Sequence, residues 1–165
     1  MTEPRVETVR RSFRPERITT LFVGESAPHS GDFFYCGNTG MQTYMRDVVE
    51  QAFGPTDNFL KTFQSYGWYL DDLVLEPVDK GFSKLARKAK CLGAIESLAK
   101  RIAVYQPQAI VSALKGIEPF VVAAAIGAQS SAPRYCVSFA GNGHQNKFGV
   151  EMAAIIHNLP RIIRP

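Results

Sequence analysis

Short apolar runs alternate with amphipathic segments along most of this chain. Four of the apolar runs have the length of buried strands, over residues 18–23, 68–75, 109–114 and 134–139. Apolar residues at helical spacing predict helices from 38 or 39 to 53, from 82 to 105, from 116–119 to 128, and from the end of the loop at 146 to about 158. Four strands that alternate with helices predict an α/β fold, a three-layer αβα sandwich with a central four-stranded parallel sheet.

The segment before the first predicted strand is polar and rich in arginine. We therefore divide the chain into a basic N-terminal arm, residues 1–17, and a single domain, residues 18–165. A total of 165 residues is the usual size of one domain. Residues 56–66 are expected to form a second short helix or an irregular segment.

Composition narrows the class of protein. The chain is 45% hydrophobic and 21% charged, which is ordinary for a soluble globular domain. No apolar run approaches the roughly 20 residues that span a bilayer, and the N-terminus lacks the apolar core of a secretion signal. We expect a cytoplasmic monomer that has no membrane contact. Cys36, Cys91 and Cys136 lack metal-ligand spacing and are too few for a four-cysteine iron–sulfur cluster, so we expect free thiols, no metal and no cofactor.

The net charge of +4 is unevenly distributed. One group of cations precedes the first strand, and consists of Arg5, Arg10, Arg11, Arg14 and Arg17. The other group lies in the helix predicted over residues 82–105 and just before it, and consists of Lys80, Lys84, Arg87, Lys88, Lys90, Lys100 and Arg101. Clustered cations suit a phosphate backbone, although a solvated helix face has the same composition. We predict that Lys84, Lys88 and the N-terminal arginines contact phosphates.

Most of the unusual chemistry follows the first, second and fourth predicted strands. Residues 24–35 read GESAPHSGDFFY, an Asp71-Asp72 pair interrupts the second strand, and residues 140–146 read AGNGHQN. Ligands of open α/β sheets bind at the carboxyl ends of the strands, so we expect these segments to meet at one edge. An acid, a hydroxyl, an imidazole and adjacent aromatic rings can hold a flat heterocycle and act on it.

This pattern resembles the uracil-DNA glycosylase superfamily over roughly residues 18–159. The first motif of those proteins is G-[EQ]-x-x-P, followed by an aromatic residue that stacks on the extruded base. Here residues 24–28 read Gly-Glu-Ser-Ala-Pro, and Phe34, or else Phe33, would stack. The resemblance is to a divergent branch without an iron–sulfur cluster, and it implies a four-stranded parallel sheet with flanking helices.

Two later segments carry the residues that the resemblance assigns to the base. A polar side chain after the second strand reads the base in these proteins, and here it would be Asp72 or else Asp71. The loop after the last strand carries a His or Asn beside the departing base, and here it would be Asn142, His144 or Asn146. The residues predicted to contact the DNA strand are Asn146 and Lys147 beside this loop, together with Lys84 and Lys88 from the cluster of cations.

The resemblance implies a DNA glycosylase of base-excision repair. Such an enzyme flips a damaged base, with uracil as the default, into a pocket and hydrolyses its N-glycosidic bond. Glu25 would position the attacking water or stabilise the sugar cation, and His144 would stabilise the leaving base. Ser26 joins this catalytic set because it stands where better-studied branches have Asp or Asn. Gly24 belongs to the substrate-binding set.

The same residues also have structural interpretations. Glu25 and Ser26 are typical of a turn, and the Phe33-Phe34 pair could be core packing alone. The Asp71-Asp72 pair could hydrogen-bond at the end of its strand, since adjacent acids in a buried strand are costly unless they are paired.

Three other functions compete with base excision. In an acyl hydrolase with Ser26 as nucleophile, Pro28 stands where the second glycine of G-x-S-x-G is needed. No G-x-G-x-x-G follows the first strand and no GK[ST] loop occurs, which disfavours nucleotide binding. The third competing function is that of a protein with the same fold that binds lesion or abasic DNA without releasing a base. A related enzyme would cleave and retain its abasic product.

Overall fold

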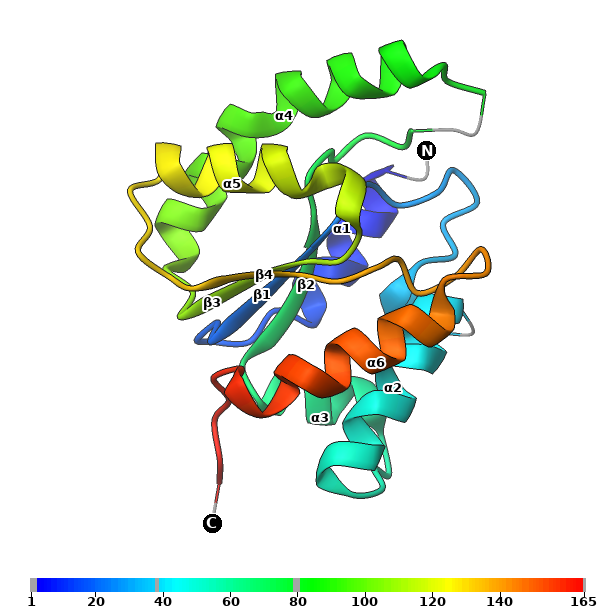
Figure 1. Ribbon diagram of the computed structural model, residues 1–165, viewed down its shortest axis with the longest axis vertical. Helices are drawn as coiled ribbons and strands as arrows, with labels where there is room; N and C mark the ends of the chain where they lie inside the picture. The colour runs from blue at the N-terminus through cyan, green and yellow to red at the C-terminus, as the bar shows by residue number, and fades with distance from the viewer. Residues whose placement is uncertain (1–2, 38, 79–80, 165) are drawn as a thin grey trace.

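Four strands form one all-parallel sheet in the order β2-β1-β3-β4. The computed structural model describes residues 3–37, 39–78 and 81–164 (Figure 1). The strands are β1 (Thr20–Gly24), β2 (Trp68–Asp72), β3 (Ala109–Ser112) and β4 (Arg134–Cys136). Thr20 lies opposite Trp68 of β2 and opposite Ala109 of β3, so β1 is a central strand. The predicted parallel sheet is confirmed, and β2, β3 and β4 each end two or three residues earlier than expected.

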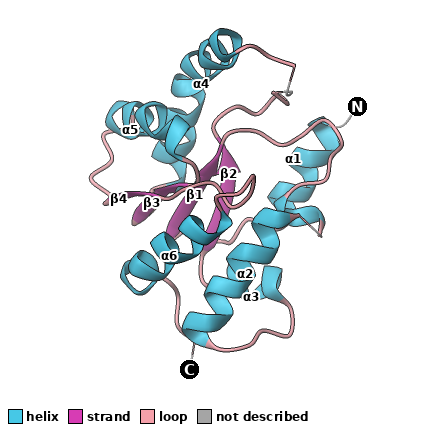
Figure 2. Ribbon diagram, turned by 45° about the vertical axis from the view of Figure 1, so that its right-hand side comes forward, coloured by secondary structure: helices cyan, strands magenta, loops and turns pink. Residues whose placement is uncertain are grey.

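Helices cover both faces of the sheet, which completes the predicted αβα sandwich. One face carries α2 (Gly40–Phe53), α3 (Phe59–Ser65) and α6 (Gln145–Ile155). The opposite face carries α4 (Lys84–Tyr105) and α5 (Glu118–Gly127), which pack on each other (Figures 1 and 2). Short 3₁₀ turns are η1 (Phe34–Cys36), η2 (Lys115–Ile117) and η3 (Ile156–Asn158). Because both faces are covered, β2 and β3 are buried throughout, and β1 is buried up to Gly24 at its end.

Three helices begin at side chains that accept a backbone hydrogen bond. Thr39 accepts from the N–H of Gln42 at the start of α2, as the sequence predicts, while the alternative cap Asn38 lies outside the described residues. Asn58 and Ser83 cap α3 and α4 in the same way.

The N-terminal segment, expected to be a polar arm, contributes helix α1 (Glu3–Ser12) to the packed structure. Val6 and Arg10 are buried, and the ring of Phe13 stacks on Tyr35 at 5.1 Å between ring centroids. The carbonyl of Leu70 accepts a hydrogen bond from Arg10 (3.4 Å), and the Leu70 N–H donates to the Tyr35 hydroxyl (2.7 Å). These bonds satisfy outward-facing backbone groups of the edge strand β2. The prediction that Arg10 contacts phosphate is therefore wrong.

The direction in which successive strands are added to the sheet reverses between β1 and β3. The chain passes from β1 to β2 on one side, and then crosses back to β3 on the other side. Ligand crevices of open α/β sheets lie at such a point, outside the carboxyl ends of the strands. The loops that follow β1, β2 and β4 lie on one side of the molecule, at the right in Figure 1. In the part of the chain that the structure describes, no helix is long and apolar enough to cross a membrane.

Candidate functional site

Glu25 is the first residue after the central strand β1, and its position is fixed from two directions. The ladder between the loops continues past the strands, because Leu73 N–H donates to the Gly24 carbonyl (2.8 Å) and Val74 N–H donates to the Glu25 carbonyl (2.9 Å). Arg87 of α4 donates from Nη2 to Oε1 of Glu25 in an ion pair. The Glu25 side chain is 18% exposed. Within residues 3–37, 39–78 and 81–164, no group donates a hydrogen bond to its second oxygen, Oε2.

Gly24 and Ser26, on either side of Glu25, have structural roles. A Cβ on Gly24 would lie 2.5 Å from Oδ1 of Asp72, so only glycine leaves room for that carboxylate. The hydroxyl of Ser26 accepts from the Val78 N–H (3.2 Å) and ties the first loop to the second. Among the described residues, no histidine or carboxylate hydrogen-bonds this hydroxyl, as the general base of a serine nucleophile would. The structure thus gives no support to a substrate role for Gly24 or a catalytic role for Ser26.

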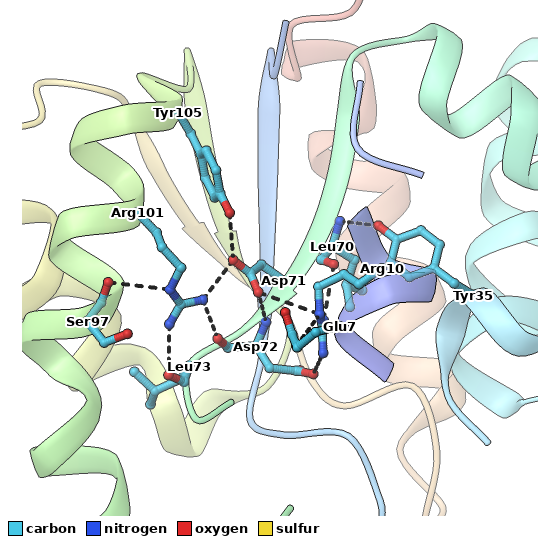
Figure 3. A network of polar contacts seen from close by, with 10 residues as sticks. All are labelled: Glu7, Arg10, Tyr35, Leu70, Asp71, Asp72, Leu73, Ser97, Arg101 and Tyr105. Atoms are coloured by element: carbon cyan, nitrogen blue, oxygen red, sulfur yellow. Dashed lines mark hydrogen bonds and ion pairs between the residues drawn. The ribbon is translucent and has the colours of Figure 1, made fainter. Parts of the chain in front are cut away.

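Asp71 and Asp72 lie buried at the end of β2, each paired with an arginine from a different helix (Figure 3). Arg10 of α1 donates from Nη2 to Oδ2 of Asp72 at 2.8 Å. Arg101 of α4 donates from Nη1 to Oδ2 of Asp71 (2.7 Å) and to the carbonyl of Asp72 (2.8 Å), and from Nη2 to the carbonyl of Leu73 (3.1 Å). Two cations therefore balance two carboxylates inside the protein.

The electrostatics of this network are those of a buried, closed cluster. Burial raises the pKa of Asp72, while the charge and hydrogen bond of Arg10 lower it. Burial disfavours the charged form of Arg10, but the nearby carboxylates of Asp72 and Asp71 outweigh this and raise its pKa. Both carboxylates are already bonded to arginines of the protein. The prediction that Asp72, or else Asp71, reads a base is therefore corrected to a structural role.

Phe33 and Phe34 lie in the core and not beside an open pocket. Phe34 is 3% exposed, and its ring packs at centroid distances of 5.0 Å from Tyr35 and 5.1 Å from Phe63. Phe33 lies beneath the Arg10 guanidinium, 5.4 Å from its ring centroid. Both rings are buried against protein groups, so the expectation that one of them stacks on a base is corrected.

An aromatic ring that the sequence analysis missed is exposed at this edge of the sheet. Phe139 lies three residues after the end of β4 and is 39% exposed. Its ring lies against the backbone of Gly141, where an added Cβ would stand 3.0 Å from a ring carbon. The sequence could have indicated Phe139 by its position, because it is an aromatic residue between an apolar strand and a polar, glycine-rich loop.

The loop after β4 is held at its start and exposed at its tip. The N–H and hydroxyl of Ser138 donate to the carboxylate of Glu151 on α6 (2.7 and 2.9 Å). Asn142 is exposed with a φ of 52°, a left-handed conformation that asparagine tolerates. His144 is exposed and directly precedes α6. Two further predicted site residues are exposed in the first turn of α6: Asn146 and Lys147.

The first turns of α4 add exposed cations. Lys84 and Lys88, predicted to contact phosphates, are exposed, while Arg87 between them turns inward to Glu25. Lys80 lies outside the described residues. Figure 1 shows this end of α4 on the same side of the molecule as the loops after β1 and β4.

A groove of about 690 Å³ lies between α4 and the segment after β2. Its walls are mainly small and aliphatic, with Phe82 and the ion pair of Lys90 with Glu76 (2.9 Å) among the lining residues. Neither Glu25 nor His144 lines this groove, but Val74 does, and its N–H donates to the Glu25 carbonyl (2.9 Å), so the groove begins beside the loop that carries Glu25.

The described residues contain no group of three or more His, Cys, Asp or Glu that could hold a metal ion. Cys36, Cys91 and Cys136 are free, and burial raises the pKa of Cys136 to about 11.

The fold and the site define an α/β protein with an open parallel sheet and a candidate site where β1 and β4 end. No protein-family model matches the sequence, and no curated protein matches it significantly. The assignment of function therefore depends on the residues described above.

Proposed function

We propose that this protein is a DNA glycosylase-like hydrolase that excises a damaged base, uracil first among the candidates, in base-excision repair. The observation that carries the proposal is the placement of Glu25. It follows the central strand inside the Gly-Glu-Ser-Ala-Pro motif, is fixed by Arg87, and keeps one carboxylate oxygen without a hydrogen-bond partner among the described residues. A half-buried, positioned carboxylate of this kind suits the activation of a water molecule.

Hydrolysis of an N-glycosidic bond separates charge along the bond that breaks. Positive charge develops on the sugar, and negative charge develops on the departing base. Oε2 of Glu25 would hold the attacking water or stabilise the sugar cation, and the imidazole of His144 would donate a hydrogen bond to the base. Preorganised groups of this kind each contribute about 3–4 kcal/mol to the stabilisation of a transition state.

The exposed residues of the β4 loop supply the contacts to the base. We assign stacking to Phe139, because its ring is the exposed aromatic at this edge while Phe33 and Phe34 are buried. Stacking of a base on an aromatic ring is worth about 1–3 kcal/mol. The amide of Asn142 offers both a donor and an acceptor, which matches the edge of uracil.

Cations around the site fit the phosphate backbone of the DNA. Lys84 and Lys88 project from the first turns of α4, and Lys147 projects from the first turn of α6 beside Asn146. Each lysine that neutralises a phosphate releases counterions, so binding should weaken as salt concentration rises.

A single-turnover assay tests the proposal. An end-labelled single-stranded oligonucleotide with one uracil is incubated with excess protein, and half of each sample is treated with hot alkali before a denaturing gel. We expect alkali-dependent cleavage by the wild type, and rates lower by about 10²–10⁴-fold for Glu25→Gln and His144→Ala. Glu96→Gln is the matched control, since Glu96 is an exposed glutamate that pairs with Lys100 on α4. Strand cleavage that Glu25→Gln leaves unchanged would contradict the assigned role.

The closed Asp71-Asp72 network and the buried phenylalanines favour a second candidate. These residues are the ones that the family resemblance assigns to the base pocket, and in this protein they are occupied by other contacts. A protein of this kind would bind lesion or abasic DNA without releasing a base. It predicts a mobility shift on abasic DNA together with no free uracil, whereas release of uracil excludes it. A retarded band without alkali would instead identify an enzyme that retains its product.

A further inference from the structure

Arg87 connects α4 to the proposed catalytic carboxylate from 62 positions further along the chain. We propose that Arg87 is a positioning residue for Glu25, which fixes Oε1 so that Oε2 is presented to the water in one orientation. This inference rests on the proposed function. It makes the first turns of α4 part of the site, although nothing in the sequence motif after β1 refers to them.

The contact is suited to this task by its chemistry. A glutamate side chain has three rotatable bonds, and at 18% exposure it has room to change rotamer unless a partner holds it. The hydrogen bond from a guanidinium to a carboxylate oxygen is charge-assisted, so it is stronger than a hydrogen bond between neutral groups. The backbone of Glu25 is already fixed by Val74, which means that Arg87 completes the restraint at the carboxylate end.

The position of Arg87 on its helix separates it from the neighbouring surface cations. Arg87 is 36% exposed, whereas Lys84 and Lys88 on the same turns are exposed to solvent. Arg101 is fourteen residues further along α4, which is nearly four full turns and therefore the same helix face. Two arginines on that face form ion pairs with carboxylates near the edge of the sheet: Arg87 with Glu25, and Arg101 with Asp71.

The competing role for Arg87 is a direct contact with a DNA phosphate. The two roles differ in whether the effect of Arg87 passes through Glu25. A positioning residue has no effect on rate once the carboxylate is gone, whereas a phosphate contact weakens DNA binding whatever residue stands at position 25.

A double-mutant cycle with a salt titration distinguishes the two roles. Single-turnover release of uracil is measured for the wild type, Arg87→Met, Glu25→Gln and the double variant. We expect Arg87→Met to lower the rate at least 10-fold in the wild-type background and less than 2-fold in the Glu25→Gln background, and Arg87→Lys to recover part of the rate. The dependence of affinity on salt should match the wild type for Arg87→Met, while the control Lys88→Met should lower its slope by about 0.7–0.9.

Additive effects, or a salt slope that Arg87→Met lowers as Lys88→Met does, would overturn the positioning role while the proposed function stands. A wild-type protein that releases no base overturns the proposed function and this inference together. If Arg87→Met does not fold, as judged by circular dichroism, the cycle is run with Arg87→Lys, for which the same additivity criterion decides.

Discussion

Replacement of Arg10 by methionine should remove the nearest cation from a buried carboxylate. The side chains of Arg10 and Asp72 are 1% and 7% exposed, and their charged atoms lie 2.8 Å apart. Methionine keeps much of the apolar stem of arginine, so the change isolates the charge and its hydrogen bonds. Removal of one partner of a buried pair costs about 3–5 kcal/mol, because the other charge stays buried without compensation. We expect Arg10→Met to lower the free energy of unfolding by this amount at pH 8.

Such a loss is a large share of the stability of a domain. Unfolding free energies of about 5–15 kcal/mol are typical, and one kcal/mol corresponds to about 2–4 °C in Tm for a chain of this size. The expected fall in Tm is therefore about 6–20 °C. Arg101 limits the loss, since this cation stays bonded to Oδ2 of Asp71 at 2.7 Å and its charge lowers the pKa of Asp72.

The loss should depend on pH in a defined direction. Burial holds the pKa of Asp72 above its ordinary value of 3.8 in the wild type, and the loss of Arg10 raises that pKa further. A carboxyl whose pKa is higher in the folded state stabilises the fold below the unfolded pKa, and this contribution is lost as pH rises through the folded pKa. The destabilisation of Arg10→Met should thus be smaller at pH 5 than at pH 8.

Urea unfolding at the two pH values measures both effects. The single tryptophan, Trp68, is fully buried in β2, so its fluorescence reports on the sheet that the network stabilises. Arg11→Met is the matched control, because Arg11 is an exposed arginine of the same helix and should change stability by less than about 0.5 kcal/mol. A loss below 1 kcal/mol for Arg10→Met at pH 8, or an equal loss at both pH values, would refute the argument.

Three further predictions concern the edge of the sheet. Gly24→Ala should destabilise the protein by about 1–3 kcal/mol in urea, since the new Cβ overlaps the carboxylate of Asp72; wild-type stability would contradict the close approach. Ser26→Ala should lose about 0.5–1.5 kcal/mol with the hydrogen bond from Val78 and release base at the wild-type rate, and a large rate loss would restore Ser26 to the catalytic set. Phe139→Ala should weaken binding to a single-stranded oligonucleotide about 5–150-fold, as expected for one lost stack, with a Tm within about 2 °C of the wild type; unchanged affinity would refute the stacking role.

The fold could be predicted from the sequence because its dominant signals are local. Apolar runs bounded by Gly or Pro mark the four strands, and stripes at helical spacing mark the helices between them. Errors concentrate at the ends of strands, where the apolar run continues past the last paired residue. Leu73 and Val74 are an example, since both are buried and apolar but lie beyond β2.

The site was less predictable because its residues depend on partners far along the chain. Phe34 belongs to a motif that suggests stacking, yet α3 brings Phe59 and Phe63 against its ring and closes it off. Glu25 is held by Arg87, which the sequence analysis treated as one of a row of surface cations. Sequence spacing cannot show which of three neighbouring cations on a helix turns inward, since the choice depends on where the helix crosses the sheet.

The pairing of α1 with β2 was nevertheless indicated by two complementary anomalies. Arg10 lies four residues after Val6 and three before Phe13, so a charge interrupts the apolar stripe of a helix. The Asp71-Asp72 pair interrupts a buried strand, which is costly unless cations neutralise it. Each anomaly is unfavourable alone, and a contact between them removes both. A domain boundary at residue 17 separates the two halves of that contact, so the segment before it belongs to the same folded unit as the sheet.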